Sequence, residues 1–100
     1  MEENELPKID LPEDWVIGTD INKDLLGLYT HYPVRLKCEI FVLCLEGEVE
    51  ALVNLNEMHV HPNEVITLMP GSIFQINEIK GDLRIYFLGF SSKFIERGGQ

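Results

Sequence analysis

The run RLKCEIFVLCLE, residues Arg35–Glu46, is the longest strand-like stretch of this 100-residue chain. Its first half alternates charged and apolar residues, whereas Ile40–Leu45 is apolar at every position. This pattern is typical of a strand that has one solvated face where it begins and is covered on both faces further along. Gly47 follows the run and predicts a turn. The run therefore predicts the central strand of an all-β domain.

Turn residues divide the rest of the chain into shorter strands. Turns are predicted near residues 47, 55, 62, 70 and 81, and a spacing of about 8–12 residues between turns is typical of a sandwich or barrel. Ser91 and Ser92 predict the cap of a helix that begins at Lys93. The predicted strands are Leu26–His31, Glu48–Leu55, Met58–His61, Glu64–Met69, Ser72–Ile79 and Leu83–Phe90.

We expect one barrel at residues 25–91. An acidic, partly irregular N-terminal arm at 1–24 precedes it, and the start of a helix or tail at 92–100 follows it. The net charge is −9, which would repel the phosphates from which DNA-binding proteins draw most of their affinity. We therefore expect that this chain is not itself a DNA-binder.

No stretch of the sequence predicts a membrane span or a secretory signal. The longest apolar run has six residues, Ile40–Leu45, whereas a spanning helix needs about 20. The N-terminus carries Glu2, Glu3 and Glu5 where a secretory signal has basic residues. We therefore expect a cytoplasmic protein without a membrane partner.

The two cysteines, Cys38 and Cys44, fall in one predicted strand. Six residues of extended strand separate their Cα atoms by roughly 20 Å, which is too far for a disulfide bond. Both are therefore expected to be reduced thiols of the core, which suits a cytoplasmic protein.

The segment HVHPNE, residues 59–64, is a candidate metal site. His59 and His61 project from one face of a strand, and Glu64 follows; imidazole and carboxylate are ligands for Fe(II), Mn(II) or Zn(II). The alternative is a surface hairpin edge that happens to contain two histidines, which the following Pro62 favours. The remaining histidine, His31, is a further candidate ligand. We expect the surface edge, and hence no metal and no cofactor.

No pattern in the sequence indicates nucleophilic catalysis, and we expect that the protein is not an enzyme. Both cysteines lie in an apolar strand without the electropositive, partly exposed setting that produces a thiolate. No serine lies in a Gly-x-Ser-x-Gly elbow. The candidate ligand-binding residues are Arg35, Phe74, Tyr86 and Leu88, which could line an apolar cavity with one cation for an anionic group. For the aromatic residues the alternative is simple core packing.

Three segments carry a resemblance to a known family. They are the strand that runs into Gly-Glu at Phe41–Val49, the strand that runs into Pro-Gly at Asn63–Ile73, and the closing strand Leu83–Phe90. Their order resembles the N-terminal cupin-like sensor domain of AraC-type transcription regulators, over about residues 25–95. The resemblance implies a small double-stranded β-helix that binds a small-molecule effector or signals by contact. It also implies a homodimer, which the family usually forms through helices that follow the barrel.

The resemblance also implies that DNA is contacted only through helix-turn-helix parts that are absent from this chain. The function expected is therefore an effector-sensing or regulatory domain of an AraC-type regulator. Two alternatives stay open. One is a stand-alone metal-dependent cupin enzyme that uses His59, His61 and Glu64, although their spacing departs from the enzymatic cupin motif and no histidine follows residue 61. The other is a dimerisation module without a ligand.

Overall fold

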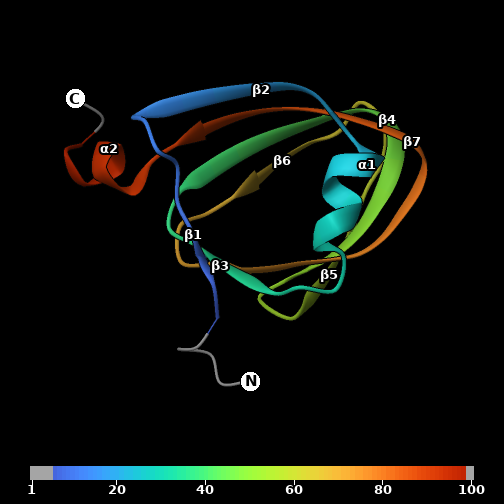
Figure 1. Ribbon diagram of the computed structural model, residues 1–100, viewed down its shortest axis with the longest axis horizontal. Coiled ribbons are helices and arrows are strands. Elements are labelled where there is room, and N and C mark those ends of the chain that lie inside the picture. The colour runs from blue at the N-terminus through green and yellow to red at the C-terminus, as the bar shows by residue number, and fades with distance from the viewer. Residues whose placement is uncertain (1–5, 99–100) are drawn as a thin grey trace.

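The computed structural model describes residues 6–98 and consists mainly of β-strands. Two short helical turns lie between β2 and β3, and one short helix follows β7 (Figure 1). The elements in chain order are β1 (Lys8–Ile9), β2 (Trp15–Asn22), α1 (Lys23–Leu26), η2 (Gly27–Tyr29), β3 (Val34–Leu36), β4 (Glu39–Val53), β5 (Asn56–Val60), β6 (Val65–Leu68), β7 (Ile73–Phe90) and α2 (Ser92–Glu96).

The two longest strands, β4 and β7, pair antiparallel along almost their whole length, from Glu39 opposite Phe90 to Val53 opposite Phe74. In one half of this ribbon β6 pairs with β4 and β2 pairs with β7; in the other half β5 pairs with β4 and β3 pairs with β7. β1 adds to β3 in parallel. The two halves curve around one interior, so the strands form a small barrel with α1 at one side (Figure 1).

The ribbon bends where two glycines face each other. Gly47 and Gly81 have φ of +78° and +73°, and a Cβ on Gly81 would lie 3.6 Å from the Cα of Gly47. The pairing shifts register between Cys44 and Glu46 and again between Glu46 and Glu48, across Gly47, which identifies a β-bulge. The predicted turns at 47 and 81 are therefore wrong, because both strands continue through the glycines. Bulges and turns both use a left-handed backbone, so a glycine in the sequence does not show which of the two will form.

The other predicted turns are confirmed. Asn54 and Leu55 join β4 to β5 with φ of 51° and 69°, the two left-handed residues of a type I′ hairpin turn. Pro70 and Gly71 form the centre of a turn closed by the Ser72 N–H, which donates to the Met69 carbonyl at 3.2 Å. Gly71 has φ of +89°, as position three of a type II turn requires.

The N-terminal third differs from the expectation in two places. The predicted strand at Leu26–His31 is wrong: α1 and η2 occupy residues 23–29, because Asn22 caps the helix by accepting a hydrogen bond from the Leu25 N–H at 3.1 Å. Residues 15–22, expected within the partly irregular arm, form β2 and pair with β7. The part of the arm at residues 1–5 lies outside the described residues.

The core lies between the two halves of the ribbon. Cys44 is fully buried in a cluster of apolar side chains, and Cys38 is fully buried nearby in the chain between β3 and β4. Both cysteines are free, so the expectation of reduced core thiols is confirmed. Burial raises the pKa of both thiols. The buried members of the cluster are Cys44, Val49, Ala51, Val60, Ile76, Leu83 and Ile85.

The expected C-terminal helix is confirmed and begins one residue earlier than predicted. The Ser91 hydroxyl accepts a hydrogen bond from the Phe94 N–H at 3.2 Å and caps α2. Within residues 6–98, none of the helices has the length and apolar character that crossing a membrane would require.

Candidate functional site

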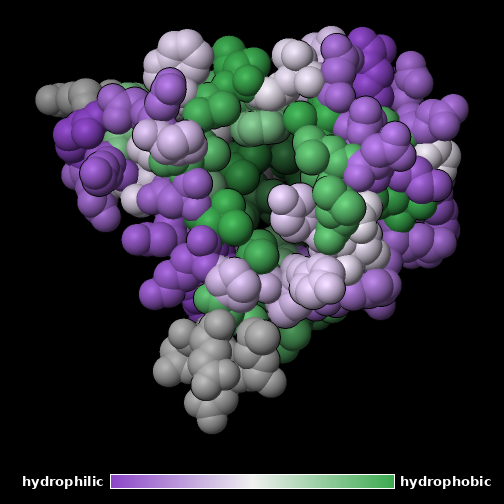
Figure 2. Space-filling view, in the orientation of Figure 1, coloured by the Kyte–Doolittle hydropathy of each residue, from purple (hydrophilic) through white to green (hydrophobic). Residues whose placement is uncertain are grey.

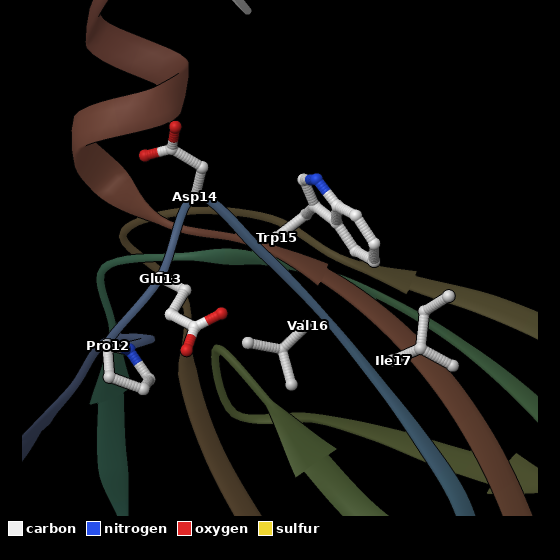
Figure 3. Close-up of a pocket in the computed structure, with 6 residues that line it drawn as sticks. All are labelled: Pro12, Glu13, Asp14, Trp15, Val16 and Ile17. Atoms are coloured by element: carbon white, nitrogen blue, oxygen red, sulfur yellow. The ribbon is translucent and has the colours of Figure 1, made fainter.

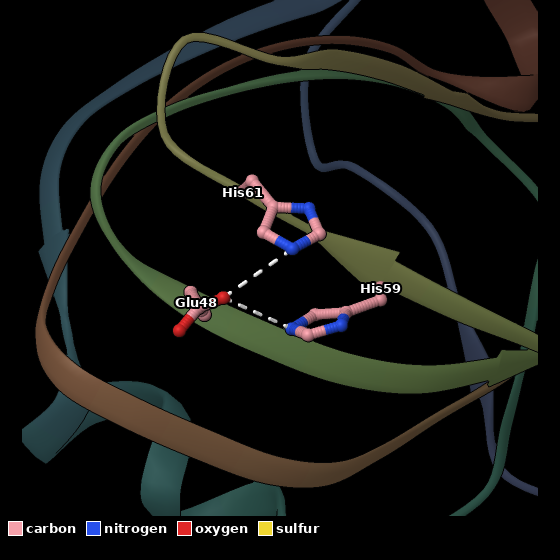
Figure 4. A group of neighbouring side chains, drawn as sticks. All are labelled: Glu48, His59 and His61. Atoms are coloured by element: carbon pink, nitrogen blue, oxygen red, sulfur yellow. Dashed lines mark ion pairs between the residues drawn. The ribbon is translucent and has the colours of Figure 1, made fainter.

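Two histidines and a glutamate meet on the outside of the barrel, where β5 pairs with β4. Val60 is buried and faces the core, so His59 and His61 on either side of it face outward. Glu48 Oε1 lies 3.2 Å from His59 Nε2 and 3.4 Å from His61 Nε2 (Figure 4). One ligand atom from each of the three residues lies within 4.8 Å of the others.

Glu64 contacts the opposite side of the His61 ring. Its Oε1 lies 3.0 Å from His61 Nδ1 and also accepts a hydrogen bond from the His61 backbone N–H. The backbone hydrogen bond, followed by the ring contact, holds the pKa of the Glu64 carboxyl below its usual range. The alternative of a metal site grouped Glu64 with the two histidines. In the structure Glu48 lies between the two imidazoles, and Glu64 contacts the other side of the His61 ring.

Glu48 was not among the residues predicted from the sequence, although the sequence contains a signal for it. The two-residue turn at Asn54–Leu55 pairs Val53 with Asn56, and counting back along both strands puts His59 opposite Glu50. Two residues further along the same register, His61 lies beside Glu48. His31 does not join this group: it is exposed, and its backbone N–H donates to the Ile76 carbonyl at 2.7 Å.

The barrel interior, in contrast, is apolar. Among residues 6–98 the only buried polar side chains are Ser72 and Ser91, so no histidine or charged side chain is buried there. Figure 2 shows a hollow lined by hydrophobic residues at the centre of the face viewed. Apolar side chains that pack against the core without being fully buried are Ile21, Leu26, Val42, Met58, Ile66, Phe74 and Ile79.

The four predicted ligand-binding residues do not line one cavity. Phe74 packs against the core. Tyr86 pairs with Leu43, and Leu88 pairs with Phe41 and Ile17, on the face of the sheet that points away from the core. The guanidinium of Arg35 donates to the Gly71 carbonyl at 2.8 Å. Their role in binding therefore stays a prediction, with Phe74 alone on the interior side.

A cleft of about 680 Å³ lies along the start of β2, at residues 12–17. Glu13 and Val16 point to one side of the chain, and Trp15 and Ile17 point to the other (Figure 3). This cleft was not predicted from the sequence.

Apolar side chains also form rows on the outside of β2, β7, β4 and β6. One row aligns Ile17, Leu88 and Phe41, and the next aligns Tyr86, Leu43 and Val65. Ile17 and Val65 are 59% and 64% exposed. We call this surface the outer apolar face; its members are Trp15, Ile17, Phe41, Leu43, Val65, Tyr86, Leu88 and Phe90.

Among the comparisons with known proteins, only the solved structures give matches, and these concern the fold. No protein-family model matches the chain, and no curated protein matches its sequence. An ethanolamine utilization protein Q (EutQ) from Salmonella typhimurium aligns with a TM-score of 0.61 at 15% identity, over 80% of this chain and 60% of that one. The Cnp3 cupin domain from Schizosaccharomyces pombe aligns with a TM-score of 0.59 at 14% identity, over 90% of this chain and 66% of that one.

EutQ from Clostridium difficile aligns with a TM-score of 0.55 at 13% identity, over 83% of this chain and 76% of that one. The chain thus spans 60% of the length of the Salmonella protein. At these identities the likeness concerns the fold. Together with the paired long strands bent around an apolar interior, it shows that this protein is a small all-β barrel of the cupin fold.

Proposed function

We propose that this barrel is a non-catalytic domain that binds a small apolar effector in its interior and belongs to a cytoplasmic AraC-type transcription regulator. The observation that carries the proposal is the chemistry of the interior, where the described residues bury neither a histidine nor a charged side chain. Such a lining suits an apolar molecule and offers no acid, base or metal ligand. The AraC assignment rests on the resemblance of Phe41–Val49 and Asn63–Ile73, and any contact with DNA belongs to parts outside this chain.

The partial burial of the interior residues supports an accessible lumen. Val42, Ile66 and Phe74 pack against the core cluster, yet none of them reaches full burial. Side chains that face inward and still contact solvent border a space open to the outside, and Figure 2 shows such a hollow. Because the chain carries a net charge of −9 and the Arg35 guanidinium already donates to a carbonyl, we propose a neutral rather than an anionic effector.

Binding of the neutral dye Nile red tests this proposal. The expected result is saturable fluorescence enhancement, and Ile66→Phe should weaken the affinity by about tenfold because the larger ring fills the lumen. Leu55→Phe is the matched control: it also introduces a phenylalanine ring, on a side chain that is 86% exposed at a hairpin tip, outside the lumen and away from the outer apolar face.

Circular dichroism is the check that both variants fold. Absence of saturable binding to the wild-type protein, or equal loss in the two variants, would remove the support for an effector in the lumen.

The metal-dependent enzyme is less well supported by the geometry. His59 and His61 face away from the core, with side chains 39% and 49% exposed, so a metal held there would lie outside the barrel. A substrate in the lumen would not reach it.

A dimerisation module is the second candidate function, and the outer apolar face favours it. Large contiguous apolar patches are rare on monomeric proteins. A second copy is the occupant we propose, because a face without charged residues can be covered by its own copy, whereas charged faces of a chain with net charge −9 would bring like charges into the contact. The two central rows of this face contain no charged residue.

Sedimentation equilibrium over a wide range of protein concentration tests the dimer. Ile17→Glu should shift the wild-type dimer to a monomer, because it puts a charge on an exposed member of one of the two central rows. Leu55→Glu is the control, since Leu55 is 86% exposed at a hairpin tip away from this face. A monomeric wild-type protein at every concentration would rule out this second function.

A further inference from the structure

We propose that Glu48, His59 and His61 bind a Zn²⁺ ion on the outer surface of the barrel, where β4 and β5 pair. The site is independent of an effector in the lumen, because Val60 between the two histidines faces the core while both imidazoles face outward. One carboxylate and two imidazoles are ligands that zinc accepts in proteins.

The distances fit a zinc coordination sphere. Zinc binds nitrogen and oxygen ligands at about 2.0–2.1 Å, so two ligand atoms of a tetrahedral site lie about 3.3 Å apart. Glu48 Oε1 lies 3.2 Å from His59 Nε2 and 3.4 Å from His61 Nε2. All three ligand atoms lie within 4.8 Å of one another, so small side-chain rotations would let an ion bind between them without a change of strand pairing.

The hydrogen bonding of His61 also fits a metal ligand. Its Nδ1 lies 3.0 Å from Glu64 Oε1 and its Nε2 lies 3.4 Å from Glu48 Oε1. A neutral imidazole carries one ring proton and cannot donate to both carboxylates. If Nδ1–H donates to Glu64, the Nε2 lone pair points at the ion, which is the usual carboxylate–histidine–zinc arrangement.

The backbone holds the three ligands in place. His59 and His61 are two residues apart along one strand, and their rings lie 4.1 Å apart between centroids. Glu48 belongs to the paired strand β4, next to the bend at Gly47. The three side chains are about a third to a half exposed, which leaves the remaining coordination position to water.

The surrounding charges favour a cation. Glu64 lies behind His61, and Glu50 lies opposite His59 on β4. Lys80 forms an ion pair with Glu50, with its Nζ 3.4 Å from Glu50 Oε1. The carboxylates in this group outnumber the single ammonium, so the local field attracts a divalent ion.

Zinc titration of the wild-type protein by calorimetry, with a chelator to set the free metal, tests the site. One ion per chain is expected. His59→Asn and Glu48→Gln should each weaken zinc binding by at least about tenfold, and Glu64→Gln by about 10–100-fold through loss of the His61 orientation. His31→Asn should leave the affinity unchanged, because His31 lies outside the cluster.

Cobalt substitution supplies a second readout. Strong visible absorption with one equivalent of Co²⁺ would support a four-coordinate site, and its loss in His59→Asn but not in His31→Asn would assign the ligands. Absence of stoichiometric metal, or equal effects of His59→Asn and His31→Asn, would overturn the zinc site. Nile red binding by the same variants separates the two proposals, since the zinc ligands lie outside the lumen.

Discussion

Leu55 is the most exposed large apolar residue at a strained backbone position. It is 86% exposed and has φ of 69° at the second central position of the type I′ turn between β4 and β5. A left-handed backbone costs a non-glycine residue about 1–2 kcal/mol, and glycine is favoured at this position.

Replacing Leu55 with glycine should therefore stabilise the protein by about 1 kcal/mol, since the relief of strain exceeds the added entropy of the unfolded chain. Urea unfolding measures the change in the free energy of unfolding. Leu55→Ala is the matched control: it removes the same apolar side chain but keeps a Cβ, so it should bring no such gain. Equal stabilisation by both variants would show that the exposed side chain, and not the backbone, was unfavourable.

At the scale of elements, Asp10 ties the N-terminal segment to α2. Its Oδ1 accepts a hydrogen bond from the Ser92 N–H at 3.0 Å, and its Oδ2 accepts one from the Ser92 hydroxyl. These bonds, the hydroxyl bond first, hold the pKa of Asp10 below its ordinary value of 3.8. A carboxyl whose pKa is lower in the folded protein stabilises it above the ordinary pKa, and this contribution disappears as the pH falls through the folded value.

Asp10→Asn should therefore destabilise the protein at pH 7, and the difference should disappear as the pH falls through the lowered pKa of Asp10, below which the wild-type carboxyl is protonated as well. Urea unfolding at several pH values checks the difference between the two proteins. Glu57→Gln, which removes a carboxylate from the exposed β5, serves as the control for net charge. A stability gap between wild type and Asp10→Asn that stays constant down to pH 2 would contradict the role assigned to the charge.

At the scale of the whole molecule, the bend at Gly47 lets β4 and β7 serve both halves of the barrel. A Cβ on Gly47 would lie 2.7 Å from the Cα of Leu83, so the neighbouring strand leaves no room for a side chain. Gly71 also has a positive φ but has no atom within 4 Å of such a Cβ. Both glycines therefore have a left-handed backbone, but only Gly47 also lacks room for a side chain.

Gly71→Ala should destabilise the protein by about 1–2 kcal/mol, which is the cost of the left-handed backbone. Gly47→Ala should cost a further 1–3 kcal/mol or so, because the clash with Leu83 forces the two strands apart. Thermal and urea unfolding of the pair measure the difference. Equal losses would mean that the bend tolerates a side chain, and that packing of β4 on β7 does not depend on the glycine.

The sequence by itself determined most of the strands after residue 34, the turns near residues 55, 62 and 70 and the C-terminal helix, because alternation, turn residues and caps act over a few neighbouring residues. The two-residue turn at Asn54–Leu55 even sets the register that brings Glu48 to His61. Tertiary pairing decided the rest. Gly47 could end a strand in a turn or form a bulge within a continuous strand, and the pairing of β4 with β7 selects the bulge. Residues 15–22 form the strand β2 because β7 pairs with them. The face of β7 that points inward was likewise decided by the bulges between its two halves, since each extra residue exchanges the two faces. That exchange puts Phe74 against the core and Tyr86 and Leu88 on the outside.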